Sequence, residues 1–255
     1  MKSCCRQILI IPQANIREAM SGRVAIVTGG AGGLGREIVF ALFRSGCRVC
    51  VNYYRSREEA CTIVDGMAEK GIALQADVGD YEAAARMGQQ VNDLWGRVDI
   101  VVNNAGITRD ALLIKQSEED WDNVMAVNVK GAFNVMKACM SFMKSGGHIV
   151  NISSYSGIKG KTGQAAYSAS KAALLGLTKT AAIELAGRGI KVNAVLPGYM
   201  PTAMGSAASG SLEDAKHQSL LNKLSDPCEA AQFIAYLVTT NNITGQTFIF
   251  DSRII

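Results

Sequence analysis

The sequence is poor in the residues that build catalytic metal centres. It has only two histidines, His148 and His217, and they lie far apart in the chain. Neither one stands near cysteines or carboxylates at the spacing that metal ligands require. The cysteines, seven in all, form an odd set without the spacing of a disulfide framework, which indicates reduced thiols. We therefore expect no metal site and a cytoplasmic protein.

The sequence also lacks long apolar runs and blocks of basic residues. Its first apolar run covers only residues 8–11, too short for a signal sequence or for a membrane span of about 20 residues. Lysine and arginine number 26 against 22 acidic residues, a net charge of +4, and they are scattered. We therefore expect neither a membrane nor a nucleic acid as a partner.

Apolar segments of strand length do occur, and they alternate with segments of helical periodicity. Each is rich in Val, Ile or Leu, as expected of strands buried on both faces. This alternation predicts a single doubly wound α/β Rossmann domain, a seven-stranded parallel sheet with helices on both faces. The folded pattern begins near Met20, so we assign residues 20–255 to the domain and residues 1–19 to an N-terminal extension. The expected strands are 23–28, 48–53, 72–77, 99–104, 148–153, 191–196 and 247–250.

The first expected strand runs directly into a glycine-rich turn, TGGAGGLG, at residues 28–35. Glycines allow the backbone to turn tightly and approach a pyrophosphate, and the following helix offers free N–H groups at its start. Two spacings fit a dinucleotide-binding turn: Gly30, Gly32 and Gly35, or Gly29, Gly33 and Gly35. A plain tight turn is the alternative interpretation.

Several further motifs follow this turn in order along the chain. They are ADV at 76–78, NNAG at 103–106, VN at 127–128, NISS at 151–154, YSASK at 167–171 and PG at 197–198. Together with the glycine-rich turn they resemble the short-chain dehydrogenase/reductase family. The resemblance covers residues 20–251 and is strongest to bacterial 3-oxoacyl-(acyl-carrier-protein) reductases. It implies the glycine set Gly29, Gly33 and Gly35.

The YSASK motif places a phenol and an ammonium four residues apart. On a helix, Tyr167 and Lys171 would lie on one face and could reach the same ligand. Tyr167 would act as the general acid and base, and the positive charge of Lys171 would favour its phenolate. Ser154 would hydrogen-bond the reacting oxygen. By resemblance, Lys171 also holds the nicotinamide ribose, and Asn128 supports a water that carries protons to Lys171.

The resemblance implies cofactor contacts at the end of most strands. These are Gly29, Gly33, Leu34 and Gly35 after the first strand; Asn52 and Arg55 after the second; Asp77 and Val78 after the third; Asn104, Ala105 and Gly106 after the fourth; and Pro197, Gly198 and Thr202 after the sixth, together with Tyr167 and Lys171.

The segment after the second strand favours NADP(H) over NAD(H). It reads Asn-Tyr-Tyr-Arg-Ser at residues 52–56, with no carboxylate for a free ribose 2′-hydroxyl and with Arg55 available for a 2′-phosphate. Gly32 argues against a preference for NADP(H), because many NADP-dependent relatives carry Arg or Lys at that position.

We therefore expect an NADPH-dependent enzyme of fatty-acid synthesis that reduces a 3-oxoacyl thioester bound to acyl carrier protein. Two alternatives stay open: a dehydrogenase of a coenzyme A ester or another small alcohol, and a catalytically silent nicotinamide-binding regulator or scaffold. Arg188 matches one arginine of the family's carrier-docking patch, but a solvated cation at a helix end explains it equally well. The second docking arginine is replaced by Ser145, beside Lys144.

Three further features concern assembly and substrate access. The helical segments 111–141 and 165–186 are rich in small and apolar residues, which favours a homotetramer or a dimer. Residues 205–211 have the small, polar composition of a substrate lid or of a linker turn. The chain has Asp251, Ser252 and Arg253 where the family commonly has Asp-Gly-Gly, so substrate choice is the least certain expectation.

Overall fold

The computed structural model describes residues 13–202 and 212–253. Its seven strands form one parallel sheet in the order β3-β2-β1-β4-β5-β6-β7. This confirms the predicted doubly wound α/β fold. Residues 205–211, which the sequence suggested as a substrate lid or a linker turn, lie outside the described residues. The strands are β1 Val24–Val27, β2 Arg48–Tyr53, β3 Gly71–Gln75, β4 Val98–Asn103, β5 Met143–Ile152, β6 Lys191–Pro197 and β7 Thr247–Phe250.

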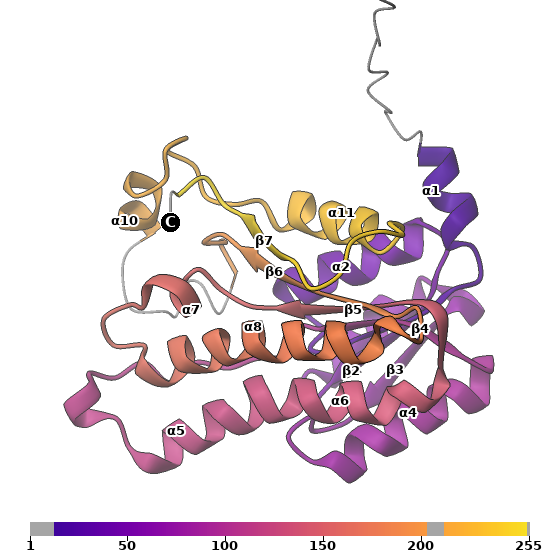
Figure 1. Cartoon of the computed structure of the whole chain (residues 1–255), viewed down its shortest axis with the longest axis horizontal. Coiled ribbons are helices and arrows are strands. Elements are labelled where there is room, and N and C mark those ends of the chain that lie inside the picture. Colours follow the sequence, from indigo (N-terminus) through magenta and orange to yellow (C-terminus); the bar gives the residue numbers. More distant parts are fainter. Residues whose placement is uncertain (1–12, 203–211, 254–255) are drawn as a thin grey trace, which may run out of the picture.

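Helices cover both faces of the sheet (Figure 1). Apolar side chains of α2, α3 and α11 form one core with the sheet, and those of α4, α6 and α8 form the other. None of the described helices is long and apolar enough to cross a membrane. The described helices are α1 Gln13–Met20, α2 Gly33–Arg44, α3 Arg57–Asp65, α4 Tyr81–Trp95, α5 Glu118–Met125, α6 Gly131–Cys139, α7 Ser156–Lys159, α8 Ala165–Ala186, α10 Leu212–His217 and α11 Pro227–Leu237.

Strand β5 departs most from its expected bounds, and the other strand boundaries shift by at most two residues. Strand β5 begins at Met143, five residues before the expected start at His148, and its pairing with β4 shifts register between Val98 and Ile100. Helix α1 lies in the segment assigned to the extension except for its last residue, Met20, which begins the assigned domain and is fully buried in the core.

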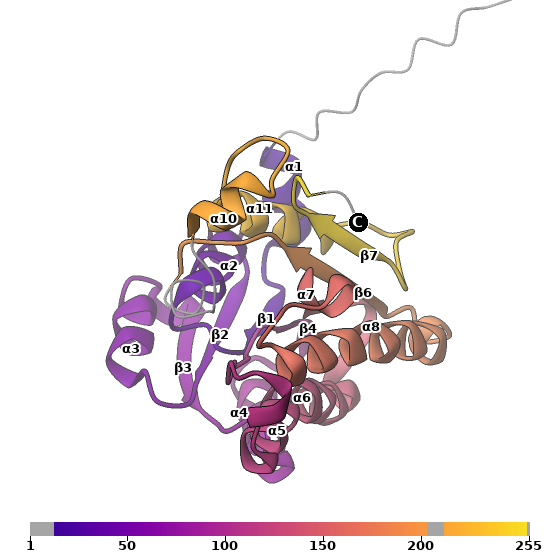
Figure 2. The same cartoon turned by 90° about the vertical axis from the view of Figure 1, so that its left-hand side faces the viewer.

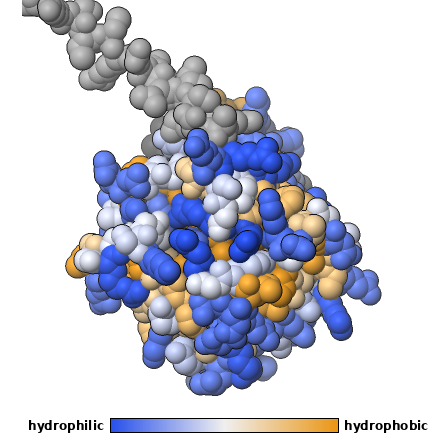
Figure 3. Space-filling view, turned by 90° about the vertical axis from the view of Figure 1, so that its right-hand side faces the viewer, coloured by the Kyte–Doolittle hydropathy of each residue, from blue (hydrophilic) through white to orange (hydrophobic). Residues whose placement is uncertain are grey.

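The strand order reverses between β1 and β4, since β2 lies on one side of β1 and β4 on the other. In open parallel sheets the loops at the carboxyl ends diverge at this point and leave a crevice for a ligand. Figure 2 views the molecule from this end, with α7 and the start of α8 near the viewer. Figure 3 views the opposite end, where hydrophilic side chains predominate and hydrophobic ones are scattered among them.

Candidate active site

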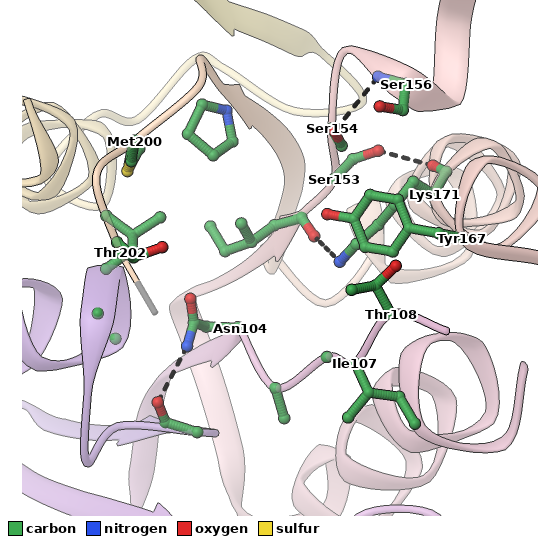
Figure 4. A pocket seen from close by; sticks show the side chains of 18 of the residues that line it. Asn104, Ile107, Thr108, Ser153, Ser154, Ser156, Tyr167, Lys171, Met200 and Thr202 are labelled. Carbon is green, nitrogen blue, oxygen red and sulfur yellow. Dashed lines mark hydrogen bonds between the residues drawn. The ribbon is translucent and has the colours of Figure 1, made fainter. Parts of the chain in front are cut away.

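A cavity of about 1400 Å³ lies at the carboxyl ends of the strands. It receives residues from the segments that follow β1, β2, β4, β5 and β6, which are distant in sequence. Every site residue expected from the sequence lines this cavity, with the exception of Asn128. The fold therefore brings the expected cofactor and catalytic residues together in one place (Figure 4).

The glycine-rich turn has the backbone geometry that the second glycine spacing requires. Gly29 and Gly33 have φ angles of +60° and +52°, which side chains other than glycine's disfavour. A Cβ on Gly35 would stand 2.2 Å from the Gly29 carbonyl oxygen and 2.5 Å from Asn104 Nδ2. A Cβ on Gly32 would meet nothing within 4 Å. These facts support Gly29, Gly33 and Gly35 as the glycines that the turn needs.

Thr28 and Asn104 connect this turn to the neighbouring loop after β4. The Thr28 hydroxyl accepts hydrogen bonds from the backbone N–H groups of Asn104 (2.9 Å) and Ala105 (3.0 Å). In return, Asn104 Nδ2 donates to the carbonyl oxygens of Thr28 (3.0 Å) and Gly29 (3.1 Å). Helix α2 starts at Gly33, directly behind the turn, with the free N–H groups of a helix start. The turn thus fits the pyrophosphate of a dinucleotide.

Asn52 and Arg55 follow β2 but differ in environment. Asn52 is buried; its Nδ2 donates to the Ala76 carbonyl oxygen (3.1 Å), and its Oδ1 accepts from the Gly29 N–H (3.4 Å). It therefore braces the ends of three neighbouring strands. Arg55 is exposed, and its guanidinium lies 5.3 Å from the centre of the Tyr54 ring. The cavity residues 53–56 include no carboxylate.

The loop after β6 returns to the glycine turn. The Thr202 side chain lies 3.5 Å from the position that a Cβ on Gly33 would take. A Cβ on Gly198 would collide with Ser225 Oγ at 2.0 Å and approach the Asp251 carboxyl carbon at 3.0 Å. Gly198 therefore gives the C-terminal segment room to pass close to this loop.

Helix α8 and the end of β5 supply the side chains that the sequence predicts to be catalytic. Lys171 is buried, and its Nζ donates to the Ile152 carbonyl oxygen (2.8 Å) and lies 5.6 Å from the centre of the Tyr167 ring. Ser154 hydrogen-bonds the Tyr167 side chain. Ser154 Oγ also accepts from the Ser156 backbone N–H (3.2 Å). One phenol, one hydroxyl and one ammonium thus converge on the cavity, as the sequence predicts.

The structure changes the expected electrostatics of Tyr167. Burial raises the pKa of its phenol, the hydrogen bond with Ser154 opposes this, and the charge of Asp110 adds to the increase. Burial also lowers the pKa of Lys171 to about 8. The sequence led us to expect that Lys171 would favour the phenolate. Lys171 is not among the causes of the shift in the pKa of Tyr167, and the raised pKa favours the protonated phenol, the form that can give up a proton.

Asn128 lies behind the cavity wall, on the π-helical turn Ala126–Lys130 between α5 and α6. Its Oδ1 accepts from the Ile107 N–H (2.8 Å), and its Nδ2 donates to the Ile107 carbonyl oxygen (3.0 Å) and to Ser170 Oγ (2.9 Å). Asn128 Oδ1 and Lys171 Nζ both lie within 3.4 Å of the Cβ position at Gly106. Asn128 therefore stands next to Lys171, and its role in carrying protons stays a prediction.

The sequence did not predict two contacts between side chains at the cavity wall. The Arg253 guanidinium pairs with Asp251 and lies 4.1 Å from the centre of the Tyr155 ring, at the cavity wall. The Lys161 ammonium lies 5.3 Å from the centre of the Tyr199 ring, also at the wall. Both contacts join segments that are far apart in the chain, so no local sequence pattern predicts them.

Arg188 has contacts of its own. Its guanidinium donates to the carbonyl oxygens of Met140 (2.6 Å), the residue after α6, and Met143 (3.1 Å), the first residue of β5. The role of Arg188 in docking a carrier protein stays a prediction.

Comparisons with known proteins agree with the fold and the site. The family profile of the short chain dehydrogenases matches residues 23–212. The chain therefore belongs to the short-chain dehydrogenase/reductase family, and it is an NAD(P)-dependent oxidoreductase that resembles 3-oxoacyl-(acyl-carrier-protein) reductases. This confirms the resemblance inferred from the sequence motifs.

Individual relatives show how close this resemblance is. The 3-oxoacyl-(acyl-carrier-protein) reductase FabG of Staphylococcus aureus (strain N315) is 42% identical over 231 residues, 88% of this chain and 94% of that protein. The 3-oxoacyl-(acyl-carrier-protein) reductase of Synechocystis sp. is 39% identical over 245 residues, 93% of this chain and 98% of that protein. A short chain dehydrogenase from Burkholderia cenocepacia J2315, solved in complex with NADP, has a TM-score of 0.88 at 33% identity and covers 92% of this chain and 98% of that chain.

The glycine turn gives the first testable prediction. Gly35→Ala should weaken cofactor binding at least about tenfold, because its Cβ would push the Gly29 carbonyl and Asn104 apart. Gly32→Ala, in the same turn, should change the dissociation constant less than about threefold. Titration of each variant with NADPH, followed by fluorescence, measures both constants. Equal losses in the two variants would show that the turn does not depend on this close contact.

Proposed function

We propose that the enzyme uses NADPH to reduce a 3-oxoacyl thioester, carried by an acyl carrier protein, to the 3-hydroxyacyl form. The observation that carries this proposal is the convergence of Ser154, Tyr167 and Lys171 on one cavity beside a glycine turn that fits a dinucleotide. The relatives named as 3-oxoacyl-(acyl-carrier-protein) reductases, about 40% identical along most of the chain, supply the substrate class. A role in fatty-acid synthesis follows from that class.

The three side chains have distinct tasks in the reduction. Bound NADPH would supply a hydride for the carbonyl carbon. Tyr167, held protonated by its surroundings, gives its proton to the carbonyl oxygen. Ser154 donates a hydrogen bond to the same oxygen and stabilises the charge that develops there. Lys171, anchored on the Ile152 carbonyl, keeps a cation beside the phenol and is placed to hold the cofactor ribose.

The second prediction tests this assignment and its alternatives. Tyr167→Phe should lower kcat by roughly 10²- to 10⁴-fold, since it removes the transferable proton, while NADPH affinity changes only a few-fold. The assay follows NADPH oxidation with carrier-linked 3-oxoacyl chains, their coenzyme A esters and small ketones. Residual activity above about a tenth of wild type would contradict the role of Tyr167.

The same substrate panel separates the remaining alternatives. A preference in kcat/KM for the carrier-linked chain over the coenzyme A ester supports the carrier proposal, and the reverse order contradicts it. Turnover of small ketones alone would favour a dehydrogenase of another alcohol. A silent binding protein would bind NADPH and turn over none of these substrates.

The third prediction concerns the cofactor. Arg55 lines the cavity in a segment without carboxylates, which supports a contact with the 2′-phosphate of NADPH. Arg55→Ala should therefore weaken NADPH binding at least about tenfold and leave NADH binding nearly unchanged, because a charge-assisted hydrogen bond is worth roughly 1.5–3 kcal/mol. The exposed Arg57, one residue beyond the cavity segment, offers a matched control as Arg57→Ala. Equal losses for both cofactors would refute the role of Arg55.

The fourth prediction concerns assembly. Helices α6 and α8 lie side by side and expose large apolar residues, Phe133 at 47% and Ile183 at 79%. Burial of such residues in a partner would stabilise a dimer or a homotetramer. We expect the wild type to sediment as one of these at micromolar concentration and Ile183→Glu to shift toward a smaller species. Leu94→Glu, at an exposed apolar residue of α4, serves as the control. A monomeric wild type would contradict the proposal.

A further inference from the structure

A chain of hydrogen bonds connects the loop after β4 with Ser154. Gln164 Nε2 donates to Asp110 Oδ2 (3.0 Å). Ser156 Oγ donates to Gln164 Oε1 (3.2 Å), and the Ser156 backbone N–H donates to Ser154 Oγ (3.2 Å; Figure 4 shows the last bond). Asp110 thus reaches the catalytic hydroxyl through two intermediate residues, from a different loop of the cavity.

Gln164 occupies a particular place in this chain. It is 5% exposed and stands directly before the first residue of α8, three residues before Tyr167. Its side chain makes no capping bond to its own helix and instead bridges Asp110 and Ser156. The Ala111 N–H adds a backbone bond to the Gly163 carbonyl oxygen (2.8 Å). The start of α8 is therefore fixed to the loop after β4 by both side chain and backbone.

Asp110 brings a negative charge to the same region. Its Oδ1 accepts a hydrogen bond from the Thr108 hydroxyl, and its Oδ2 accepts from Gln164, so both carboxylate oxygens have donors. A charged carboxylate disfavours a second negative charge nearby. The phenolate of Tyr167 would be such a second charge.

The cations near the cavity have partners of their own, although Lys171 also lies 5.6 Å from the centre of the Tyr167 ring. On its own helix, Lys171 is bound to the Ile152 carbonyl oxygen. From the segment before α8, Lys161 lies over the ring of Tyr199, a residue of the loop after β6. From the loop after β4, Arg109 pairs with Asp120 at 3.5 Å. From the C-terminal segment, Arg253 pairs with Asp251.

We propose that Asp110 and Gln164 are positioning residues: together they hold Ser154 and the start of α8, which carries Tyr167, in register across the cavity. Burial raises the pKa of Tyr167, the hydrogen bond with Ser154 lowers it, and the charge of Asp110 adds to the increase. The inference deepens the proposed function and rests on it, because it assigns the alignment of Ser154 and Tyr167 to residues outside the catalytic group.

The fifth prediction is a shift in the pH profile. Asp110→Asn removes the charge at nearly constant shape, so Tyr167 should lose its proton at lower pH. The basic limb of kcat/KM for thioester reduction should then move to lower pH by about half a unit or more. Asp110→Glu, which keeps the charge, should leave the limb near its wild-type position. Asp93→Asn, an equal charge change on the exposed face of α4, is the control and should not move it.

A second variant tests positioning apart from charge. Gln164→Met keeps the length of the side chain but can neither donate to Asp110 nor accept from Ser156. It should lower kcat about tenfold or more while the basic limb stays in place and NADPH affinity changes only a few-fold. This variant also tests the positioning role should Asp110→Asn fail to fold. Full activity of Gln164→Met would overturn the positioning role.

Different outcomes would contradict the proposed function and the role of Asp110. Active Tyr167→Phe would overturn the proposed function itself. Inactive Tyr167→Phe together with an unmoved limb in Asp110→Asn would overturn only the electrostatic role of Asp110. An equal shift in Asp110→Asn and Asp93→Asn would also overturn it, because the effect would then be one of net charge.

Discussion

The contact between α8 and the end of β5 is the interaction on which the site depends. Lys171 Nζ donates to the Ile152 carbonyl oxygen (2.8 Å), and Ser153 Oγ donates to the Lys171 carbonyl oxygen (2.6 Å). Gly157 makes the close approach possible, since a Cβ there would stand 2.7 Å from the Lys171 backbone carbon. These contacts hold Ser154, the next residue, close to the helix that carries Tyr167. The distance between hydroxyl and phenol is thus set by packing between two elements rather than by flexible side chains.

The glycine-rich turn, at the other end of the cavity, is also held in place by packing between elements. Thr28 and Asn104 exchange hydrogen bonds across the point where the strand order reverses, and Gly35 brings α2 against the turn. Diverging loops would otherwise leave this crevice without support. The fixed turn presents the start of α2 toward the cavity, and the Thr202 loop approaches it from β6. Binding and catalytic groups therefore share one rigid frame built on the strand ends.

Much of this arrangement could be predicted from the sequence, because it depends on local patterns. Apolar runs gave the strands, and the order of β and α segments gave the parallel sheet. The motif residues reached one cavity since they all follow strands of that sheet. The early start of β5 escaped prediction because a register shift in pairing leaves no mark in one strand's own sequence.

The remainder could not be predicted because it depends on contacts between distant segments. The π-helical turn places Asn128 behind the cavity wall, where backbone groups of Ile107 occupy its amide. Asp110 and Gln164 stand a few residues outside the NNAG and YSASK motifs, and their bond joins two segments that only the fold brings together. Arg253 lies at the cavity because the chain after β7 passes close to the loop after β6, where Gly198 leaves room for Ser225 and Asp251.

Burial of the Lys171 ammonium lowers the free energy of unfolding at neutral pH. Its pKa falls from 10.5 to about 8 because burial disfavours the charged form. The unfolded chain therefore binds more protons than the folded one between about pH 8 and 10.5, so this group's contribution to stability rises with pH across that window. Below pH 8 the folded state carries the full cost, on the order of 3 kcal/mol. Burial of the Lys171 ammonium thus costs the folded state stability at neutral pH, and a rise in pH across this window should recover it.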